Sequence, residues 1–289
     1  MNLAPRLIPL PEDFRNACAD ARKKGSRVAF VPTMGALHEG HSALVRDARA
    51  HANFVAVSIF VNPIQFGPNE DFSRYPRDLD GDVRKLRTAG ADVVFCPEAR
   101  AMYAKGERTR VHVGELDEPL CGAFRPGHFE GVATIVAKLF ALAGPCVAVF
   151  GKKDYQQLAI LRRMTTDLML PVEIVGHPIV REVDGLAMSS RNAYLSAEDR
   201  IRALSLSRGL SYAHGAFSSG ERDAVAIESL VRDAVRVNAD RVDYVSVVDA
   251  DSLASLGRIG DRALVALACH FGKTRLIDNV VLGEDSAPT

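Results

Sequence analysis

Cysteine is scarce in this sequence, and long hydrophobic runs are absent. The five cysteines are scattered, odd in number and without a C-x-x-C pair; they are Cys18, Cys96, Cys121, Cys146 and Cys269. We therefore expect buried or free thiols in a reducing cytoplasm rather than disulfides or a zinc site. No apolar run reaches the roughly 18 residues of a membrane-spanning helix. The N-terminus contains prolines and no long apolar core, so we expect no signal peptide either.

Net charge is absent too, because 36 basic residues balance 36 acidic ones. No global field would attract DNA or RNA, so we expect no nucleic-acid partner, and a phosphorylated ligand must be held by local charge.

The chain has no G-x-G-x-x-G motif. Gly272–Thr274 ends like a Walker loop but has Leu267 where that loop needs glycine. The fractions of hydrophobic (47%) and charged (25%) residues are those of a soluble globular protein of one or two domains.

Strands and helices alternate through residues 1–180. The run Phe54–Val61 is apolar except at Ser58, which is typical of a strand buried on both faces. This alternation predicts right-handed βαβ units, and hence an α/β domain with a Rossmann-like parallel sheet. The expected strands are residues 27–31, 54–61, 91–96, 146–150 and 172–175. The expected helices are residues 12–24, 78–88, 132–143 and 154–168, together with one that follows the first of these strands and ends at about residue 52.

The pattern changes in residues 181–289. Ser196, followed by Asp199, resembles a capping box, and it predicts a helix to about residue 217 and a second helix to about 238. Three expected strands, 242–248, 263–271 and 275–281, have no helices between them. We therefore expect a smaller C-terminal α+β domain with an antiparallel sheet, ending in a frayed tail at 284–289.

The most informative stretch is Pro32–His41, which reads P-T-M-G-A-L-H-E-G-H. An apolar strand pattern precedes it and a helical pattern follows it, so it predicts a strand, a glycine turn and a helix N-terminus, where an anion can bind. Two histidines at such a turn favour phosphate chemistry over ordinary solvated histidines. A zinc helix would need its second histidine at position 42, which is Ser42.

Four further polar segments carry groups suited to chemistry. Asn62 and Gln65 follow one expected strand, and residues 151–157 follow another, with lysines and a glutamine. Because ligands bind beyond the carboxyl ends of parallel strands, these segments should converge on one crevice. Arg125 and His128 precede a helix, as part of a mobile lid or an interface loop. Residues 188–192, M-S-S-R-N, offer hydroxyls and a guanidinium to a polyphosphate. Each segment alone is also compatible with an ordinary turn or a solvated charge run.

Together, in this order, the five segments resemble the pantothenate synthetase (pantoate–β-alanine ligase) family of the nucleotidyltransferase superfamily. His38-Glu39-Gly40-His41 is similar to the H-x-G-H signature of class I aminoacyl-tRNA synthetases, and Met188–Arg191 is similar to their second signature loop. The resemblance implies that pantoate is activated by ATP to pantoyl adenylate, releasing pyrophosphate. The amine of β-alanine then displaces AMP to give pantothenate.

The resemblance also implies site residues. It makes His41 the principal catalytic histidine, with His38, Lys153 and Arg191, and it assigns Gln65, Gln157 and Asn62 to pantoate and β-alanine. The residues assigned to ATP are Met34, Gly35, Ala36, Leu37, His38, Glu39, Gly40, His41, Gly151, Lys152, Lys153, Asp154, Val180, Met188, Ser189, Ser190 and Arg191. It implies ATP with Mg²⁺, for which no protein ligands are assigned, and a cytoplasmic homodimer. Lys152 departs from the family, which usually has Glu or Gln there, and we expect its side chain to point to solvent.

Three other functions remain open at this point. A nucleotidyltransferase of the same fold, such as a cytidylyltransferase or pantetheine-phosphate adenylyltransferase, would act on a phosphorylated acceptor but has no need of Gln65 and Gln157. A catalytically inactive nucleotide sensor is disfavoured by the intact set of His38, His41, Lys153 and Arg191. An RNA-binding synthetase relative is disfavoured by the zero net charge.

Overall fold

The chain forms two compact units. A computed structural model describes residues 4–68, 70 and 72–288. The N-terminal unit contains the residues up to Asp117 together with Arg125–Lys152 and Ile160–His177. The C-terminal unit contains Glu118–Phe124, Lys153–Ala159 and the residues from Pro178 onward. The domain boundary expected near residue 180 stays a prediction.

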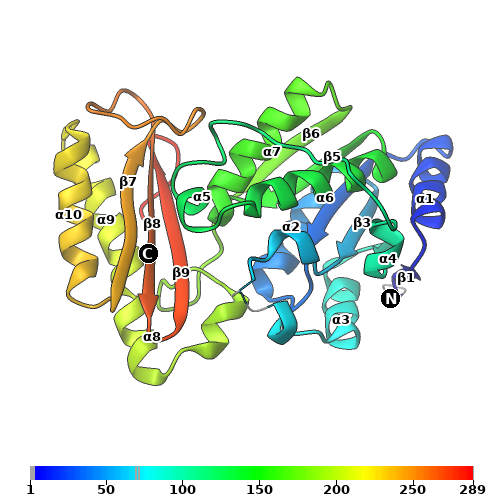
Figure 1. Cartoon of the computed structure of the whole chain (residues 1–289), viewed down its shortest axis with the longest axis horizontal. Helices are drawn as coiled ribbons and strands as arrows, with labels where there is room; N and C mark the ends of the chain where they lie inside the picture. The colour runs from blue at the N-terminus through cyan, green and yellow to red at the C-terminus, as the bar shows by residue number, and fades with distance from the viewer. Residues whose placement is uncertain (1–3, 69, 71, 289) are drawn as a thin grey trace. The chain divides into compact units, whose positions relative to one another are not determined.

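A six-stranded parallel sheet forms the centre of the N-terminal unit (Figure 1). Its strands are β1 (Arg6–Ile8), β2 (Val28–Thr33), β3 (Phe54–Ile59), β4 (Val93–Phe95), β5 (Cys146–Gly151) and β6 (Val172–His177). Their order is β1-β4-β3-β2-β5-β6, so β2 pairs with β3 on one side and with β5 on the other. The chain changes direction across the sheet at β2 and β5. The segments that follow β2, β3 and β5 therefore leave from neighbouring positions at one edge, where α/β folds bind ligands.

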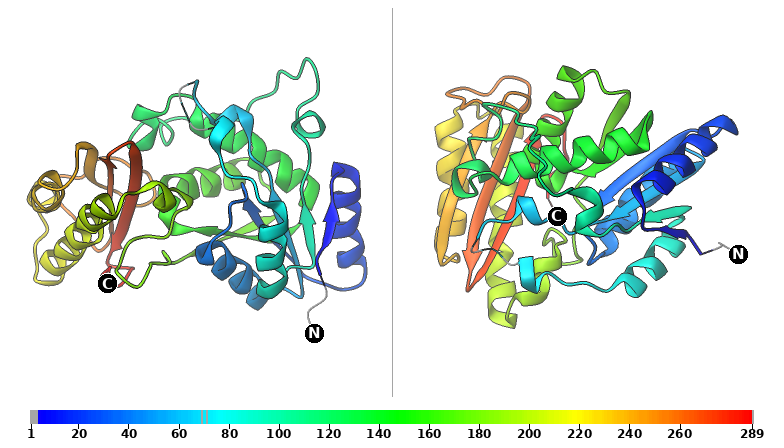
Figure 2. Two further views of the ribbon diagram at one scale, coloured as in Figure 1. Left: turned by 90° about the horizontal axis from the view of Figure 1, so that it is seen from below. Right: turned by 45° about the vertical axis from the view of Figure 1, so that its right-hand side comes forward.

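Helices cover both faces of this sheet. The helices of this part of the chain are α1 (Pro11–Lys23), α2 (Glu39–His51), α3 (Leu79–Ala89), α4 (Ala99–Met102), α5 (Cys121–Phe124), α6 (His128–Ala143) and α7 (Tyr155–Asp167), with the 3-10 turns η1 (Pro63–Gln65), η2 (Phe72–Arg74) and η3 (Lys152–Asp154). Within the unit, α1 packs against α6 and α2 packs against α3. The pair α2 and α3 lies on one side of the sheet and α6 on the other (Figures 1 and 2).

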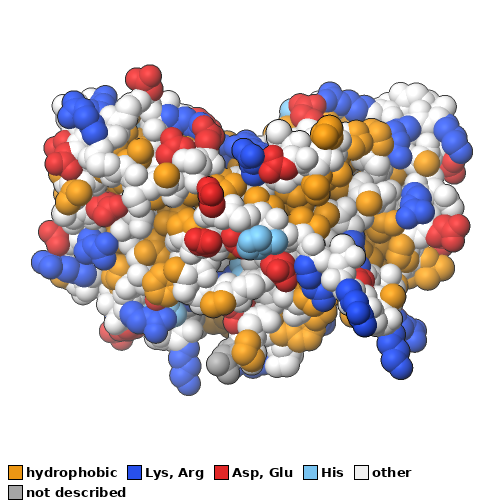
Figure 3. Space-filling view, turned by 45° about the horizontal axis from the view of Figure 1, so that its top comes forward, with side chains coloured by type: hydrophobic (Ala, Val, Ile, Leu, Met, Phe, Trp, Pro, Cys, Tyr) orange, Lys and Arg blue, Asp and Glu red, His pale blue; other side chains and the backbone are white. Residues whose placement is uncertain are grey.

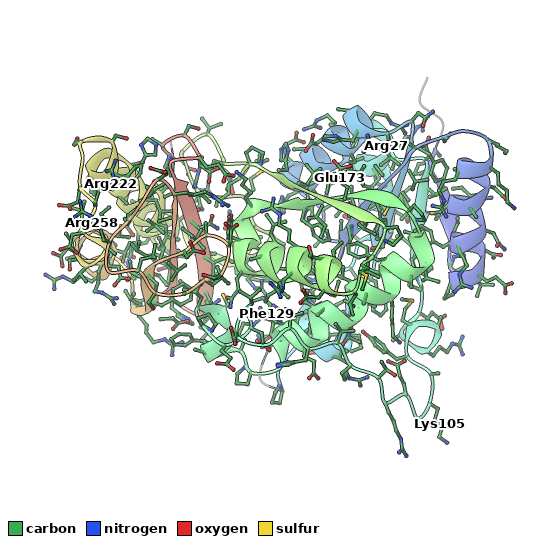
Figure 4. All side chains as sticks on the ribbon, turned by 90° about the horizontal axis from the view of Figure 1, so that it is seen from above. Arg27, Lys105, Phe129, Glu173, Arg222 and Arg258 are labelled. Atoms are coloured by element: carbon green, nitrogen blue, oxygen red, sulfur yellow. The ribbon has the colours of Figure 1, made fainter. Side chains whose placement is uncertain are left out.

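β-branched residues fill the core of the sheet. Val31, Val57 and Val94, on three adjacent strands, are fully buried and pack with Val45 and Ala48 of α2. Val and Ile suit strands buried on both faces, because their branched side chains pack tightly on the pleated surface. Directly before β2, Arg27 forms an ion pair with Glu173 of β6, 2.6 Å from nitrogen to oxygen (Figure 4). This pair is exposed, so it adds little stability.

The C-terminal unit is built on a separate antiparallel sheet of three strands in the order β7-β8-β9 (Figure 2). Besides α5, its elements are η4 (Ser190–Tyr194), α8 (Ala197–Ala203), α9 (Ser205–Ser218), α10 (Ala224–Arg236), β7 (Arg241–Val248), β8 (Ala263–Phe271) and β9 (Thr274–Leu282). Helices α9 and α10 pack on this sheet and on each other around a core of their own. The predicted fold, a Rossmann-like parallel sheet followed by an α+β part with an antiparallel sheet, is confirmed.

One strand was missed, and two local predictions were wrong. The short edge strand β1 was not expected. The single helix predicted to about residue 217 is two helices that meet at Leu204. There the backbone N–H of Leu204 donates to the carbonyl of Ile201, only three residues earlier, which interrupts the α-helical pattern. The tail is not frayed through its described residues, since Asp285 accepts a hydrogen bond from Val281 N at 2.9 Å and Pro288 is buried with its carbonyl bonded to Ser211.

The surface carries charges of both signs. On the face drawn in Figure 3, basic and acidic side chains are interspersed between apolar ones. Selectivity for an anion must therefore come from local groups, such as those described below. Within the described ranges, we find no helix that combines the length and the apolar character needed to cross a bilayer.

Candidate active site

The turn between β2 and α2 has a specific backbone conformation. Gly35 (φ 82°) and Ala36 (φ 51°) are both left-handed. Thr33 Oγ1 donates to Ser58 O at 2.7 Å and accepts from Gly35 N at 3.3 Å, which ties the turn to β3. A Cβ at Gly35 would lie 3.1 Å from both Asp82 Oδ2 and Ile59 Cγ2. Glycine is required here by its positive φ and by this close approach.

The two histidines lie at the N-terminus of α2. His38 is the N-cap residue, and its backbone N–H donates to His41 Nδ1 at 3.3 Å. Because Nδ1 accepts this bond, the neutral His41 ring carries its proton on Nε2, which is then a hydrogen-bond donor. The two rings are 4.1 Å apart between centroids. A donor imidazole at a helix N-terminus, where the peptide dipoles favour negative charge, is suited to a phosphate oxygen.

Two residues of α3 hold the same turn. Asp82 Oδ1 accepts from Leu37 N at 2.8 Å, and Lys85 Nζ donates to Leu37 O at 2.5 Å. The side chain of Asp82 is buried, and burial raises the pKa of its carboxyl group despite the hydrogen bonds from Leu37 and Ala36 and the charge of Lys85.

The two amides after β3 form a buried network. Asn62 Nδ2 donates to Gln65 Oε1 at 3.1 Å and to Gly131 O at 3.0 Å, and Asn62 Oδ1 accepts from Tyr103 Oη at 2.6 Å. Burial raises the pKa of Tyr103, so its phenol remains a donor at neutral pH. With Oε1 of Gln65 held by Asn62, its NH₂ group faces the other way and lies 2.8 Å from the sulfur of Met34. Gln65 therefore adjoins the histidine-bearing turn.

Helix α6 fixes the main chain of this amide segment. A Cβ on Gly131 would lie 2.6 Å from Ile64 O and 2.7 Å from Gln65 Cα, so only glycine allows this approach. His128, the first residue of α6, bonds through Nδ1 to Gln65 O at 2.8 Å, and it stacks edge-on against Phe129, labelled in Figure 4. The expected loop at Arg125 and His128 thus becomes a helix start that contacts Gln65.

Arg125 ties this helix start to the segment before η2. Its guanidinium makes two hydrogen bonds to the carboxylate of Glu70, at 2.7 and 2.6 Å, and a third to His128 Nε2 at 2.9 Å. Because arginine can only donate, His128 Nε2 must accept, and its Nδ1–H then donates to Gln65 O. Burial would raise the pKa of Glu70, but the hydrogen bonds and charge of Arg125 outweigh burial and lower it.

At the end of β5 the prediction about Lys152 was wrong. Lys152 as a whole is 8% exposed, so its side chain does not point to solvent, and it begins the 3-10 turn η3 directly after a buried strand. Gly151, the last residue of β5, lies against α2, since a Cβ there would meet Leu44 Cδ2 at 4.0 Å.

The other predicted residues belong to the C-terminal unit. The backbone oxygen of Lys153 accepts from Asn279 Nδ2 of β9 at 2.8 Å, Asp154 is exposed and Gln157 is half-buried. Val180 O accepts from Met188 N at 3.0 Å, which brings the two ends of the 180–188 segment together. Ser189 Oγ accepts from Arg191 N at 3.2 Å and so caps η4.

The structure thus groups the predicted residues in two sets, one in each unit. The N-terminal set contains Met34, Gly35, Ala36, Leu37, His38, Glu39, Gly40, His41, Asn62, Gln65, Gly151 and Lys152, and the C-terminal set contains Lys153, Asp154, Gln157, Val180, Met188, Ser189, Ser190 and Arg191. Contacts join Met34 to Gln65 and Gln65 to Asn62 in the first set. The roles of both sets toward a substrate remain predictions.

Comparison with known proteins identifies the family. A family profile described as pantoate-beta-alanine ligase matches residues 6–281. The chain belongs to this family. It is 53% identical to the pantothenate synthetase of Thermoanaerobacter sp. (strain X514) over 276 residues, which cover 94% of this chain and 97% of that protein. It is also 53% identical to the pantothenate synthetase of Geotalea uraniireducens (strain Rf4) over 281 residues, covering 97% of this chain and all (100%) of the relative.

Solved structures of the ligase family have the same fold. Pantothenate synthetase from Thermus thermophilus superposes with a TM-score of 0.89 at 46% identity, covering 95% of this chain and 98% of that one. The pantoate-beta-alanine ligase of Francisella tularensis, described as a complex with beta-gamma ATP and beta-alanine, gives a TM-score of 0.79 at 31% identity, covering 99% and 100%.

Some residues that build this site of the ligase fold were not predicted. Tyr103, Asp82 and Lys85 act through contacts between residues 41 to 48 positions apart, and no local pattern marks them. Gly131 was not marked either, because it lies directly before the helix expected at residues 132–143 and its contact with residues 64 and 65 is far away in the sequence.

Proposed function

We propose that this chain catalyses the ATP-dependent condensation of (R)-pantoate with β-alanine to pantothenate through pantoyl adenylate, releasing pyrophosphate and AMP. The observation that carries the proposal is that Gln65 contacts Met34 of the turn that bears His38 and His41. An amide donor suited to a small polar acid thus adjoins a phosphate-binding helix N-terminus, in a chain that belongs to the pantoate–β-alanine ligase family.

In the first step, a carboxylate oxygen of pantoate bonds to the α-phosphorus of ATP. The bond from that phosphorus to the oxygen bridging to the β-phosphate breaks, and pyrophosphate leaves with the electron pair. Negative charge develops on the α-phosphate oxygens and the leaving group. His41 Nε2–H, with the N-terminus of α2, stabilises that charge. The remaining contribution is orientation, which holds the acid in line with the phosphorus.

In the second step, the β-alanine amine bonds to the acyl carbon, the bond from that carbon to the AMP oxygen breaks, and the amine loses a proton. We assign Gln65 and Gln157 to pantoate, with Asn62 orienting Gln65 through the bond between their amides. We assign Lys153, Ser189, Ser190 and Arg191 to the phosphates, with Lys153 and Arg191 supplying positive charge. The remaining predicted ATP residues of the turn, of Gly151–Asp154 and of Val180 and Met188 contact the nucleotide.

We propose that Mg²⁺ enters as part of the substrate. Among the described residues there is no group of three or more His, Cys, Asp and Glu side chains able to hold a metal ion. Magnesium bound to nucleotides keeps water and phosphate ligands and needs at most one or two carboxylates, so Mg-ATP is the expected form.

We further propose a cytoplasmic homodimer, as the resemblance implies. Light scattering on the purified protein would give twice the chain mass of 31.3 kDa if the dimer forms.

The test of the function is a reaction of the purified protein with Mg-ATP and combinations of the two acids. AMP should form only when pantoate and β-alanine are both present, and pantoate alone should support exchange of labelled pyrophosphate into ATP. A product that retains the nucleotide would instead indicate a transferase acting on a phosphorylated acceptor. Absence of any turnover, with ATP bound, would indicate a nucleotide sensor.

A further inference from the structure

The peptide groups of Leu37 are held from both sides by α3. Asp82 Oδ1 accepts from Leu37 N at 2.8 Å, while Lys85 Nζ donates to Leu37 O at 2.5 Å. These two residues are three positions apart and therefore lie on the same face of the helix. Leu37 itself is 3% exposed and directly precedes His38, the N-cap of α2.

The surroundings of Asp82 are arranged for this contact. Its side chain is 2% exposed, and Lys85 lies 3.9 Å away as its counterion. Its second oxygen, Oδ2, occupies the space that the missing side chain of Gly35 leaves, where a Cβ would be only 3.1 Å away. A buried carboxylate is costly unless hydrogen bonds and an opposite charge compensate it. Both compensating groups here belong to the turn or to α3 itself.

The turn needs such support. Gly35 and Ala36 are consecutive left-handed residues, and Ala36 has a Cβ that disfavours this conformation. Conformations of this kind persist only where the surrounding structure fixes them. The backbone at Leu37 decides where α2 begins, and so it decides the positions of the His38 and His41 rings.

We propose that Asp82 and Lys85 are positioning residues for adenylate formation, which hold Leu37 and thereby place the two histidines at the start of α2. This inference rests on the proposed function. Neither side chain needs to touch the substrate. Asp82 is the principal member, since its carboxylate is buried, whereas the side chain of Lys85 is 48% exposed.

The experiment compares four variants, Asp82→Ala, Asp82→Asn, Lys85→Met and Asp80→Asn, in pyrophosphate–ATP exchange with pantoate. Asp80 is the matched control, because it lies in the same first turn of α3 but is exposed.

Asp82→Ala should lower kcat about 10- to 100-fold, because a displacement of about 1 Å can cost that much, and should raise KM for pantoate less than about threefold. Asp82→Asn keeps an Oδ1 acceptor and should recover most of kcat. Lys85→Met should lower kcat about 3- to 10-fold, and Asp80→Asn should match the wild type.

Three results would overturn the inference. One is a wild-type kcat in both Asp82→Ala and Lys85→Met. Another is a rise in the Mg²⁺ concentration needed for half-maximal rate in Asp82→Asn, because a carboxylate that acts by binding the metal would lose that role in the amide. A third is full additivity of the two losses in Asp82→Ala/Lys85→Met, since groups that hold one peptide should be coupled.

Thermal melting distinguishes these outcomes from unfolding. If Asp82→Ala does not fold, Lys85→Met decides the question, and a wild-type rate in that variant would reject the positioning role. An inactive wild-type enzyme would count against the proposed function and not against this inference specifically.

Discussion

His41 owes its chemistry to its own backbone neighbourhood. Because His38 N donates to its Nδ1, the opposite nitrogen carries the proton and can donate to a phosphate. Gln65 is oriented in the same manner by Asn62, which accepts a hydrogen bond from Tyr103. In both side chains one polar atom is bonded to the protein, which leaves the opposite atom available to a ligand.

His41→Ala should lower the rate of adenylate formation by about 30- to 10³-fold, or roughly 2–4 kcal/mol of transition-state stabilisation, with a much smaller change in ATP affinity. The reason is that charge on the α-phosphate grows as the reaction proceeds. Single-turnover rates and ATP titrations of the same variant would measure the two quantities. Equal losses in both would contradict a catalytic role.

Gln65→Ala should weaken pantoate handling about 10-fold while leaving ATP binding within about twofold, because it removes hydrogen bonds made to the acid alone. Calorimetric titration of ATP and the dependence of the exchange rate on pantoate concentration would separate these effects. A loss of ATP affinity as large as the loss in pantoate handling would show that Gln65 serves the nucleotide instead.

Helix α6 and the segment before η2 act as elements rather than as single residues. Gly131 lets α6 approach η1 closely, and Arg125 bonds to Glu70 and to His128, which in turn bonds to Gln65 O. The position of Gln65 therefore depends on how these two elements meet.

Gly131→Ala should force α6 and η1 apart, because the added Cβ would lie 2.6 Å from Ile64 O. We expect a loss of about 1–3 kcal/mol in the free energy of unfolding and a higher KM for pantoate. Urea denaturation and steady-state kinetics would check this. Gly215→Ala is the control, because a Cβ there meets nothing within 4 Å. Wild-type stability for Gly131→Ala would contradict the close approach.

Glu70→Gln should destabilise the protein by about 1–2 kcal/mol at pH 7, since Arg125 and Glu70 are largely shielded from water. The native pKa of Glu70 is lowered from its ordinary value of 4.5, so its stabilisation is present above that pH and is lost as pH falls through the native pKa. The difference between wild type and variant should thus be constant from pH 7 to about 5.5 and shrink in acid.

Urea denaturation at pH 7 and at pH 4 or below would measure this difference. Glu98→Gln is the matched control, because the Glu98–Arg100 pair is exposed and should contribute little at either pH. A difference for Glu70→Gln that grows on acidification would contradict the assigned direction.

On the scale of the whole molecule, the two units have separate hydrophobic cores and different sheets. In the C-terminal unit, Arg181 makes two hydrogen bonds to Asp278 of β9, at 2.8 and 3.0 Å, and the Asp278 side chain is 1% exposed. This pair joins the segment that contains Val180 and Met188 to the antiparallel sheet.

Arg181→Met should destabilise the C-terminal unit by about 3–5 kcal/mol, because it leaves the charge of Asp278 buried without its partner. Hydrogen exchange in peptides from β8 should accelerate, while peptides from β2 should keep wild-type protection, since the cores are separate. Arg258→Met is the control, at an exposed arginine of the same unit (Figure 4). Unchanged protection in β8 would reject the prediction.

The sequence by itself determined the fold class, the central turn and the family. Apolar runs such as Phe54–Ile59 mark buried strands by composition alone, and the glycine and histidines of residues 35–41 carry their signal within a few positions. Element limits were less certain, as the division at Leu204 shows, because weak local preferences give way to tertiary packing.

Only the tertiary structure decided which residues support that turn and its neighbours. Asp82, Tyr103 and Gly131 act on partners 41 to 69 positions away in the chain, and nothing near them in sequence records those partners. The burial of Lys152 was decided in the same way. Local patterns reflect the periodicity of one element, whereas hydrogen bonds between elements depend on how the sheet and helices pack, which no single segment encodes.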